Sequence, residues 1–211
     1  MTSIIDLLPI ILIAVVIIVI LVIFLPKLFQ QKRAMPTVEE LTRGHDVDTL
    51  WKALNIQLVK LHELGQYKEA TKIAEESLKS VKDIYGSDHI QTAMLTNNLA
   101  ALYRGQARFI EAEPLFKEAI VIWEKHLGKE SNEVASGLNN LADVYKLQKK
   151  YPDAESLYKN SLEIFEKNLG KEDINVAVVM ENLADLYKNT GNTSKATIMD
   201  ERARLIRAKS T

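Results

Sequence analysis

Residues 138–145 read Leu-Asn-Asn-Leu-Ala-Asp-Val-Tyr, and no other stretch says more about the architecture of the chain. Its apolar residues follow the spacing i, i+3, i+4 and i+7, and they are Leu138, Leu141, Ala142 and Tyr145. An α-helix places residues with that spacing on one face, whereas a half-buried strand requires strict alternation. The stretch therefore predicts an amphipathic helix that buries one stripe.

The same stretch recurs along the chain at a fixed interval. Asn-Asn-Leu-Ala at 139–142 is repeated at 97–100, changes to Glu-Asn-Leu-Ala at 181–184 and is reduced to Asn-Ile-Gln-Leu at 55–58. Four glycines keep the same interval, and they are Gly44, Gly86, Gly128 and Gly170. An ungapped period of this kind indicates a repeat protein. We predict four repeats, at 44–85, 86–127, 128–169 and 170–211.

Each repeat is predicted to contain two antiparallel helices. A short turn follows the first helix, as at 149–151, and the second helix is expected at about 153–168. The second helix carries an alanine that lets two helix axes approach closely, and its equivalents are Ala70, Ala112, Ala154 and Ala196. The junction glycine ends this helix, because glycine adopts a left-handed conformation at little cost. The pattern predicts an all-α protein.

These features resemble the tetratricopeptide repeat family. The resemblance rests on Asn-Leu-Ala-x-x-Tyr in the first helix, the alanine of the second, and the turn aromatics Tyr67, Phe109 and Tyr151. The 42-residue period with a Leu-Gly junction is similar to the variant found in kinesin light chains and related bacterial repeat proteins. The resemblance covers 44–211 and implies a right-handed α-solenoid of four repeats. Kinesin light chains also carry a coiled coil that pairs with the motor chain. An apolar segment stands in its place here, so motor binding is not implied.

The fourth repeat departs from the pattern. Thr193 replaces the turn aromatic, and Asp200 stands where the earlier repeats have Ala74, Phe116 and Tyr158. One side of a terminal repeat faces water instead of a neighbour, and we expect no capping helix after Thr211. The sequence therefore predicts an open apolar edge on the last helix, formed by Ile198, Leu205 and Ile206.

Residues 1–33 form a separate region. From residue 7 to residue 25 every residue except Pro9 is Ala, Val, Ile, Leu or Phe. As a helix this run spans about 28 Å, close to the ~30 Å hydrocarbon core of a bilayer. We predict a retained transmembrane anchor, with a buried core helix and a cleaved signal peptide as alternatives. A signal peptide fits less well, because no basic residue precedes the run and no small-x-small site follows it.

The flanks of the anchor predict its orientation. Lys27, Lys32 and Arg33 follow the apolar run and no lysine or arginine precedes it. The positive-inside rule therefore places the N-terminus outside and the repeat domain in the cytoplasm. Residues 34–43 are expected to form a short linker helix, because 37–40 has the form of a capping box and Gly44 ends it.

Composition excludes several classes of function. A net charge of −1 gives no electrostatic footprint for nucleic acid. The chain has no cysteine, which removes disulfides, iron–sulfur clusters and thiol catalysis. The histidines His45, His62, His89 and His126 fall at no metal-ligand spacing, and the sequence has no nucleophile elbow or phosphate loop. We expect no enzyme activity, no cofactor and no metal.

Polar rows on the first helices are the candidate binding residues. Counted from the junction glycine, position 11 holds Asn55, Asn97, Asn139 and Glu181, and position 12 holds Ile56, Asn98, Asn140 and Asn182. Position 18 holds His62, Arg104, Lys146 and Lys188. In tetratricopeptide domains the first helices line a concave groove. The resemblance implies that the asparagines at position 12 hold a peptide backbone and that the basic residues attract negative charge.

The side chains support this interpretation in part. An asparagine amide offers both donors and an acceptor, so it can bind a peptide backbone without reading its sequence. Asp143 and Asp185 lie between the rows and partly cancel the basic charge. The alternative is that the asparagines only bond to the neighbouring repeat and that the lysines are ordinary surface residues.

Taken together, these features predict a membrane-anchored scaffold or adaptor. Its partners are expected to be a protein or peptide in the groove and the lipid bilayer through the anchor. The alternative function is a structural subunit that forms a homo-oligomer, or joins a membrane complex, through the open edge of the fourth repeat.

Overall fold

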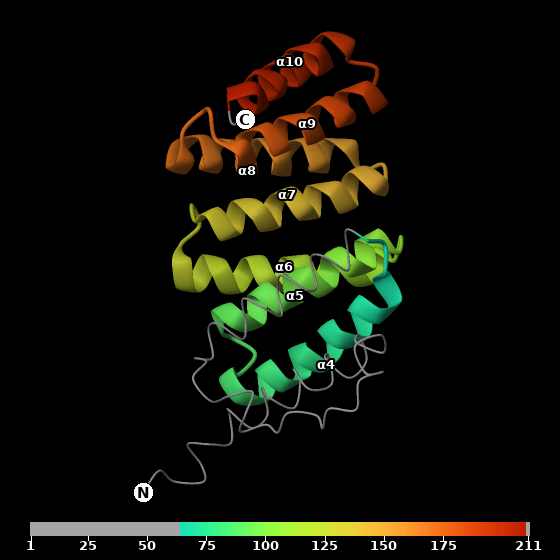
Figure 1. Ribbon diagram of the computed structural model, residues 1–211, viewed down its shortest axis with the longest axis vertical. Helices are drawn as coiled ribbons and strands as arrows, with labels where there is room; N and C mark the ends of the chain where they lie inside the picture. Colours follow the sequence, from blue (N-terminus) through green and yellow to red (C-terminus); the bar gives the residue numbers. More distant parts are fainter. Residues whose placement is uncertain (1–63, 210–211) are drawn as a thin grey trace, which may run out of the picture. The chain divides into compact units, whose positions relative to one another are not determined.

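The computed structural model describes residues 64–209, and all the regular structure in that range is α-helical, without a β-strand (Figure 1). The chain divides into two compact units, Met1–Gly105 and Gln106–Thr211. The described part of the first unit contains α4 (Tyr67–Tyr85) and α5 (Ile90–Gly105). The second unit contains α6 (Phe109–Leu127), α7 (Asn132–Leu147), α8 (Tyr151–Leu169), α9 (Ile174–Asn189) and α10 (Thr193–Lys209).

The helices follow the period of the sequence. The starts of α5, α7 and α9 are separated by the repeat interval, and so are the starts of α4, α6, α8 and α10. Each of the three repeats from residue 86 onward therefore contains two helices. The second helix begins earlier than expected, at Tyr151 instead of near residue 153. Pro152 lies in its first turn, where a proline costs no hydrogen bond, so the turn aromatic becomes the first helical residue.

The junction glycines end the second helices as predicted, but their backbone angles differ from the expected left-handed helical values. Gly128 has φ 89° and ψ 156°, and Gly170 has φ 89° and ψ 159°. These angles lie in a region that is open almost only to glycine, instead of the left-handed helical region that we expected. The amide of Gly128 still donates to the Glu124 carbonyl oxygen at 3.1 Å. Ser131 and Asp173 then cap α7 and α9 through their side-chain oxygens.

A second recurring backbone feature lies in the turn inside each repeat. Lys149 and Ala107 have φ of 63° and 57°, and Gly65 and Gly191, at the same repeat position, have φ of 69° and 76°. This left-handed residue was missed in the sequence, because two of its four occupants are not glycine. The geometry of the turn therefore comes from the packing of the two helices and not from a glycine signal.

The core of the second unit runs between consecutive helices. Helix α7 packs against α6 and α8, and α9 packs against α8 and α10 (Figure 1). The predicted stripe is confirmed on α9, where all four members are buried, namely Met180, Leu183, Ala184 and Tyr187. On α7, Leu141 and Ala142 are buried, while Leu138 and Tyr145 are half-buried. Ala154 is fully buried on α8, the helix that packs against α7, as its small side chain predicted.

Several predictions lie outside the described residues. They concern the anchor at 7–25, the linker at 34–43 and the first helix of the first repeat, which includes Asn55. Among the helices between residues 64 and 209, none is long and apolar enough to cross a membrane.

Candidate functional site

The predicted polar rows meet between α7 and α9. We define the α7–α9 face by Asn139, Asn140 and Lys146 on α7 with Asn182, Asp185 and Lys188 on α9. Two contacts join the helices across it. The Asn182 side-chain amide donates to Asn139 Oδ1 at 3.0 Å, and Lys146 Nζ lies 2.8 Å from Asp185 Oδ2. The first helices of consecutive repeats therefore present their polar rows side by side.

The lysines of this face are paired with aspartates. Lys146 Nζ also lies 3.4 Å from Asp143 Oδ1, and only 11% of its side chain is exposed. Lys188 Nζ lies 2.6 Å from Asp200 Oδ2 on α10. Since each cation already has an anion beside it, a ligand that used these lysines would have to compete with the aspartates.

The predicted asparagines and basic residues fall into two groups in the structure. Asn97, Asn98 and Arg104 are half-buried on α5 in the first unit. Asn139, Asn140 and Asn182 are half-buried in the second unit, where the Asn139–Asn182 bond joins two repeats. Asparagine is thus used at least once to align neighbouring repeats, which is the alternative role weighed above.

Two exposed apolar side chains were missed in the sequence. Val178 is 37% exposed and Leu147 is 50% exposed. Helical spacing puts Val178 on the side of α9 that carries Asn182 and Asp185, and Leu147 on the side of α7 that carries Asn140. In the adjacent repeat of the second unit the same positions hold a serine and an asparagine, so no periodic signal marked them. They supply apolar surface to an otherwise polar face.

The repeat architecture identifies the family of the chain. The model of the tetratricopeptide repeat matches residues 53–125 and 133–209. The chain belongs to the tetratricopeptide repeat family. Among curated proteins, none matches this sequence.

Several solved structures are similar to this chain, and one of them is described as having TPR-like repeats. BtubC (BKLC) from P. vanneervenii is 26% identical with a TM-score of 0.65, over 80% of this chain and 67% of that chain. A Podosopora anserina kinesin light chain with nearly identical TPR-like repeats is 22% identical with a TM-score of 0.64, over 76% of each chain. The apo form of RapI is 20% identical with a TM-score of 0.63, over 82% of this chain and 61% of that chain. The predicted kinesin-light-chain-like character of the repeats is confirmed. Tetratricopeptide repeats generally mediate protein–protein interaction and are generally non-enzymatic.

Partly buried carboxylates tie neighbouring tetratricopeptide repeats together. Glu155 on α8 accepts a hydrogen bond from the Tyr187 hydroxyl at 2.9 Å and pairs with Lys159 at 2.7 Å. The Lys159 hydrogen bond, opposed by burial, lowers the pKa of Glu155. Burial, together with Glu155, raises the pKa of Tyr187 to about 12. These contacts give the tyrosine a structural role.

The same arrangement occurs one repeat earlier within the second unit. Glu113 on α6 accepts from the Tyr145 hydroxyl at 3.2 Å and from the Gln148 amide at 3.3 Å. It also pairs with Lys117 at 2.7 Å, and this hydrogen bond lowers the pKa of Glu113. The glutamates at this repeat position carried no chemical motif in the sequence, so only the tertiary contacts reveal them.

The last tetratricopeptide helix is more polar than we expected. Ile206 is only 5% exposed, so its assignment to an open edge is wrong; it packs into the core against α9. Ile198 and Leu205 are exposed, at 54% and 64%. Three positions that are apolar in α6 and α8 carry charge in α10, and they are Asp200, Arg204 and Arg207.

Two of these charges bind back to α9. Asp200 pairs with Lys188, and Arg207 Nη2 lies 2.8 Å from Glu181 Oε2. A charged outer face suits a helix that faces water, which disfavours the predicted apolar oligomer edge. No group of three His, Cys, Asp or Glu that could hold a metal ion occurs among the residues that the structure describes.

Proposed function

We propose that this protein is a membrane-anchored tetratricopeptide scaffold that holds an extended segment of a protein partner against the α7–α9 face. The observation that carries the proposal is the exposure of Val178 and Leu147 beside the asparagines of that face. A partner that covers these side chains gains hydrophobic free energy, and the asparagine amides can bind its backbone. Family membership supports a protein as the ligand.

The ion pairs of the face restrict the chemistry of the partner. Lys146 lies between two aspartates, and Lys188 lies beside Asp200. The face therefore offers no large excess of either charge, and a strongly acidic or strongly basic segment has little to gain there. We infer a partner segment with apolar side chains at alternate positions and little net charge.

The anchor completes the proposal. The apolar run at 7–25, followed by Lys27, Lys32 and Arg33, supports a single span with the repeat domain on the cytoplasmic side. The scaffold would then recruit its partner to the membrane surface, since only the short segment 26–43 separates the end of the run from the first repeat.

Site-specific photocrosslinking tests the binding face. A photoreactive phenylalanine analogue is placed at position 178 in the full chain in cells, and at position 110 as the matched control. Ile110 is 86% exposed on α6, a helix that contributes no residue to the α7–α9 face. We expect a discrete crosslinked partner from position 178 alone, and loss of that product when Asn140→Ala and Asn182→Ala are added. Identical products from both positions, or no effect of the asparagine changes, would refute the proposed face.

Two membrane experiments test the anchor and its orientation. The full chain should resist extraction by alkaline carbonate, whereas a variant lacking 7–25 should be released. Protease added outside intact cells should leave the repeat domain whole and digest it only after lysis. Extraction of the full chain, or digestion in intact cells, contradicts the corresponding part of the proposal.

A further inference from the structure

A surface cavity recurs with the period of the repeats. The larger one, about 330 Å³, lies among the C-terminal part of α6, the start of α7 and the C-terminal half of α8. The smaller one, about 180 Å³, lies between the junction that joins α8 to α9 and the C-terminal half of α10. Four residues of the larger cavity have identical counterparts one repeat later in the smaller one: Lys129 corresponds to Lys171, Glu130 to Glu172, Ile164 to Ile206, and Lys167 to Lys209.

The two cavities differ at two aligned positions, where the larger has Asn160 and Glu163 and the smaller has Arg202 and Leu205. Arg202 of the smaller cavity reaches back to α8, where its Nη2 lies 3.0 Å from Glu166 Oε1. The residue one repeat earlier is Asn160, and the residue equivalent to Glu166 is Glu124. Asn160 is short and neutral, so it supplies no guanidinium to Glu124. The larger cavity therefore lacks the arginine that the smaller cavity contains.

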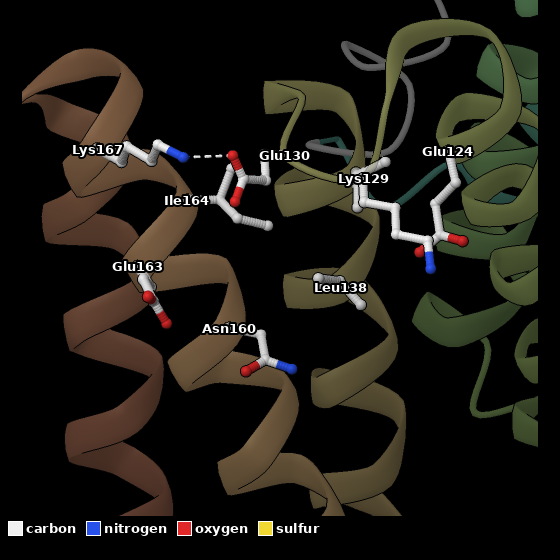
Figure 2. Close-up of a pocket in the computed structure, with 9 residues that line it drawn as sticks. Glu124, Lys129, Glu130, Leu138, Asn160, Glu163, Ile164 and Lys167 are labelled. Atoms are coloured by element: carbon white, nitrogen blue, oxygen red, sulfur yellow. Dashed lines mark hydrogen bonds and ion pairs between the residues drawn. The ribbon is translucent and has the colours of Figure 1, made fainter.

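The carboxylates of the larger cavity fit a guanidinium group. Figure 2 shows Glu124 on one side of the cavity and Asn160 with Glu163 on the other. Neither Glu124 nor Glu163 has a side-chain hydrogen bond or ion pair with any residue between 64 and 209. Glu130, by contrast, is already paired with Lys167, which is the one contact drawn as a dashed line (Figure 2). Within the described residues, Glu124 and Glu163 therefore line the cavity without an ion-pair partner, although Lys129 and Lys167 also line it.

The remaining lining also suits an arginine side chain. Leu138, Ile164 and Val134 provide apolar surface for its methylene stem. Lys129 does not prevent binding of a cation, because the smaller cavity has Lys171 at the same position and still accommodates Arg202. A planar guanidinium can also bind a carboxylate through two parallel hydrogen bonds, which an ammonium cannot.

We propose that the cavity between α6 and α8 binds an arginine side chain of a partner protein, in the position that Arg202 occupies one repeat later. This cavity lies apart from the α7–α9 face, so it would be a second contact site of the scaffold. The neighbouring repeat supplies the template, because the same fold there already contains the arginine–glutamate pair.

The test uses the full chain in detergent micelles and the peptide Leu-Arg-Leu-amide, labelled with fluorescein at its N-terminal amine, with fluorescence anisotropy as the readout. The control peptide carries citrulline, which has the shape of arginine without its charge. We expect saturable binding of the arginine peptide and about tenfold weaker binding of the citrulline peptide. Absence of saturable binding, or equal affinity for the two peptides, overturns the proposal.

Three variants locate the site. Glu124→Gln removes the carboxylate and should weaken binding of the arginine peptide by about tenfold. Asn160→Arg copies the neighbouring repeat, so its own guanidinium should occupy the cavity and abolish binding while the chain stays folded by circular dichroism. The matched control is Glu201→Gln, an exposed glutamate on α10 outside both cavities, which should bind like the wild type. Wild-type affinity in either Glu124→Gln or Asn160→Arg overturns the assignment.

Discussion

Gly137→Ala is expected to destabilise the protein, although alanine is the better helix former. Gly137 is buried in the middle of α7 and faces α6. A Cβ atom at this position would lie 2.7 Å from Ile120 Cγ1 and 3.1 Å from Trp123 Cζ3. Both neighbours are buried, and a β-branched isoleucine has little freedom to turn away. The added methyl group therefore forces α6 and α7 apart or strains a rotamer.

The magnitude follows from two opposing effects. In a helix interior alanine is favoured over glycine by about 0.8–1.0 kcal/mol. Overpacking of a filled core costs about 1–3 kcal/mol, and a contact to an inner carbon of Ile120 belongs in the upper part of that range. The free energy of unfolding should therefore fall by about 1–2 kcal/mol. For a chain of this size the melting temperature should fall by about 2–8 °C.

The assay is urea and thermal denaturation of the full chain, followed by circular dichroism. Ser156→Ala is the matched control, because Ser156 is exposed on α8 and the substitution changes only the helix propensity. The stability of this variant should rise slightly. In an Ile120→Ala background only the contact with Trp123 Cζ3 remains, so Gly137→Ala should cost less stability than it does in the wild type. A single Gly137→Ala variant as stable as the wild type would show that the methyl group is accommodated and that the reasoning is wrong.

Three further outcomes are expected. Lys149→Gly should raise the free energy of unfolding by about 0.5–1 kcal/mol, because glycine adopts its left-handed φ without strain; an unchanged urea midpoint contradicts this. Glu155→Gln should lower the pKa of Tyr187 from about 12 while burial keeps it above 10, as measured by ultraviolet titration; an unchanged pKa contradicts the contact. In the wild type, the stabilisation from this tyrosine is present below a pH of about 10 and is lost as the pH rises to about 12. Arg204→Leu with Arg207→Phe copies the apolar residues of α8 onto α10 and should cause self-association by light scattering; a monomer at all concentrations would contradict the role of these charges.

The periodic features of the fold were predictable because they are local. Helix placement depends on the spacing of apolar residues and on the glycine that ends each second helix, and both recur once in every repeat. Gly128 and Ala154 could therefore be assigned their roles before any contact was known. The binding rows on α7 and α9 could be listed in the same way, since residues at one repeat position must share one helix face.

Contacts between repeats could not be predicted, because they depend on pairs of residues far apart in the chain. Nothing in the sequence pairs Lys146 with Asp185, so the row of basic residues appeared more open than it is. Ile206 had the right spacing for an exposed edge, yet packing against α9 buries it.

The family, the repeat and the identity of the polar rows could be inferred from the sequence alone, because a helical pattern that recurs at a fixed interval is typical of repeat proteins. Which side chains are satisfied by their neighbours depends on contacts between the helices. The side chain of Trp123 fits because Gly137 lies opposite it. Arg202 pairs with Glu166, whereas Asn160 at the equivalent position leaves Glu124 without an ion-pair partner among the described residues. The physical reason is that burial and ion pairing are properties of two residues at a distance, and a periodic pattern specifies only one residue at a time.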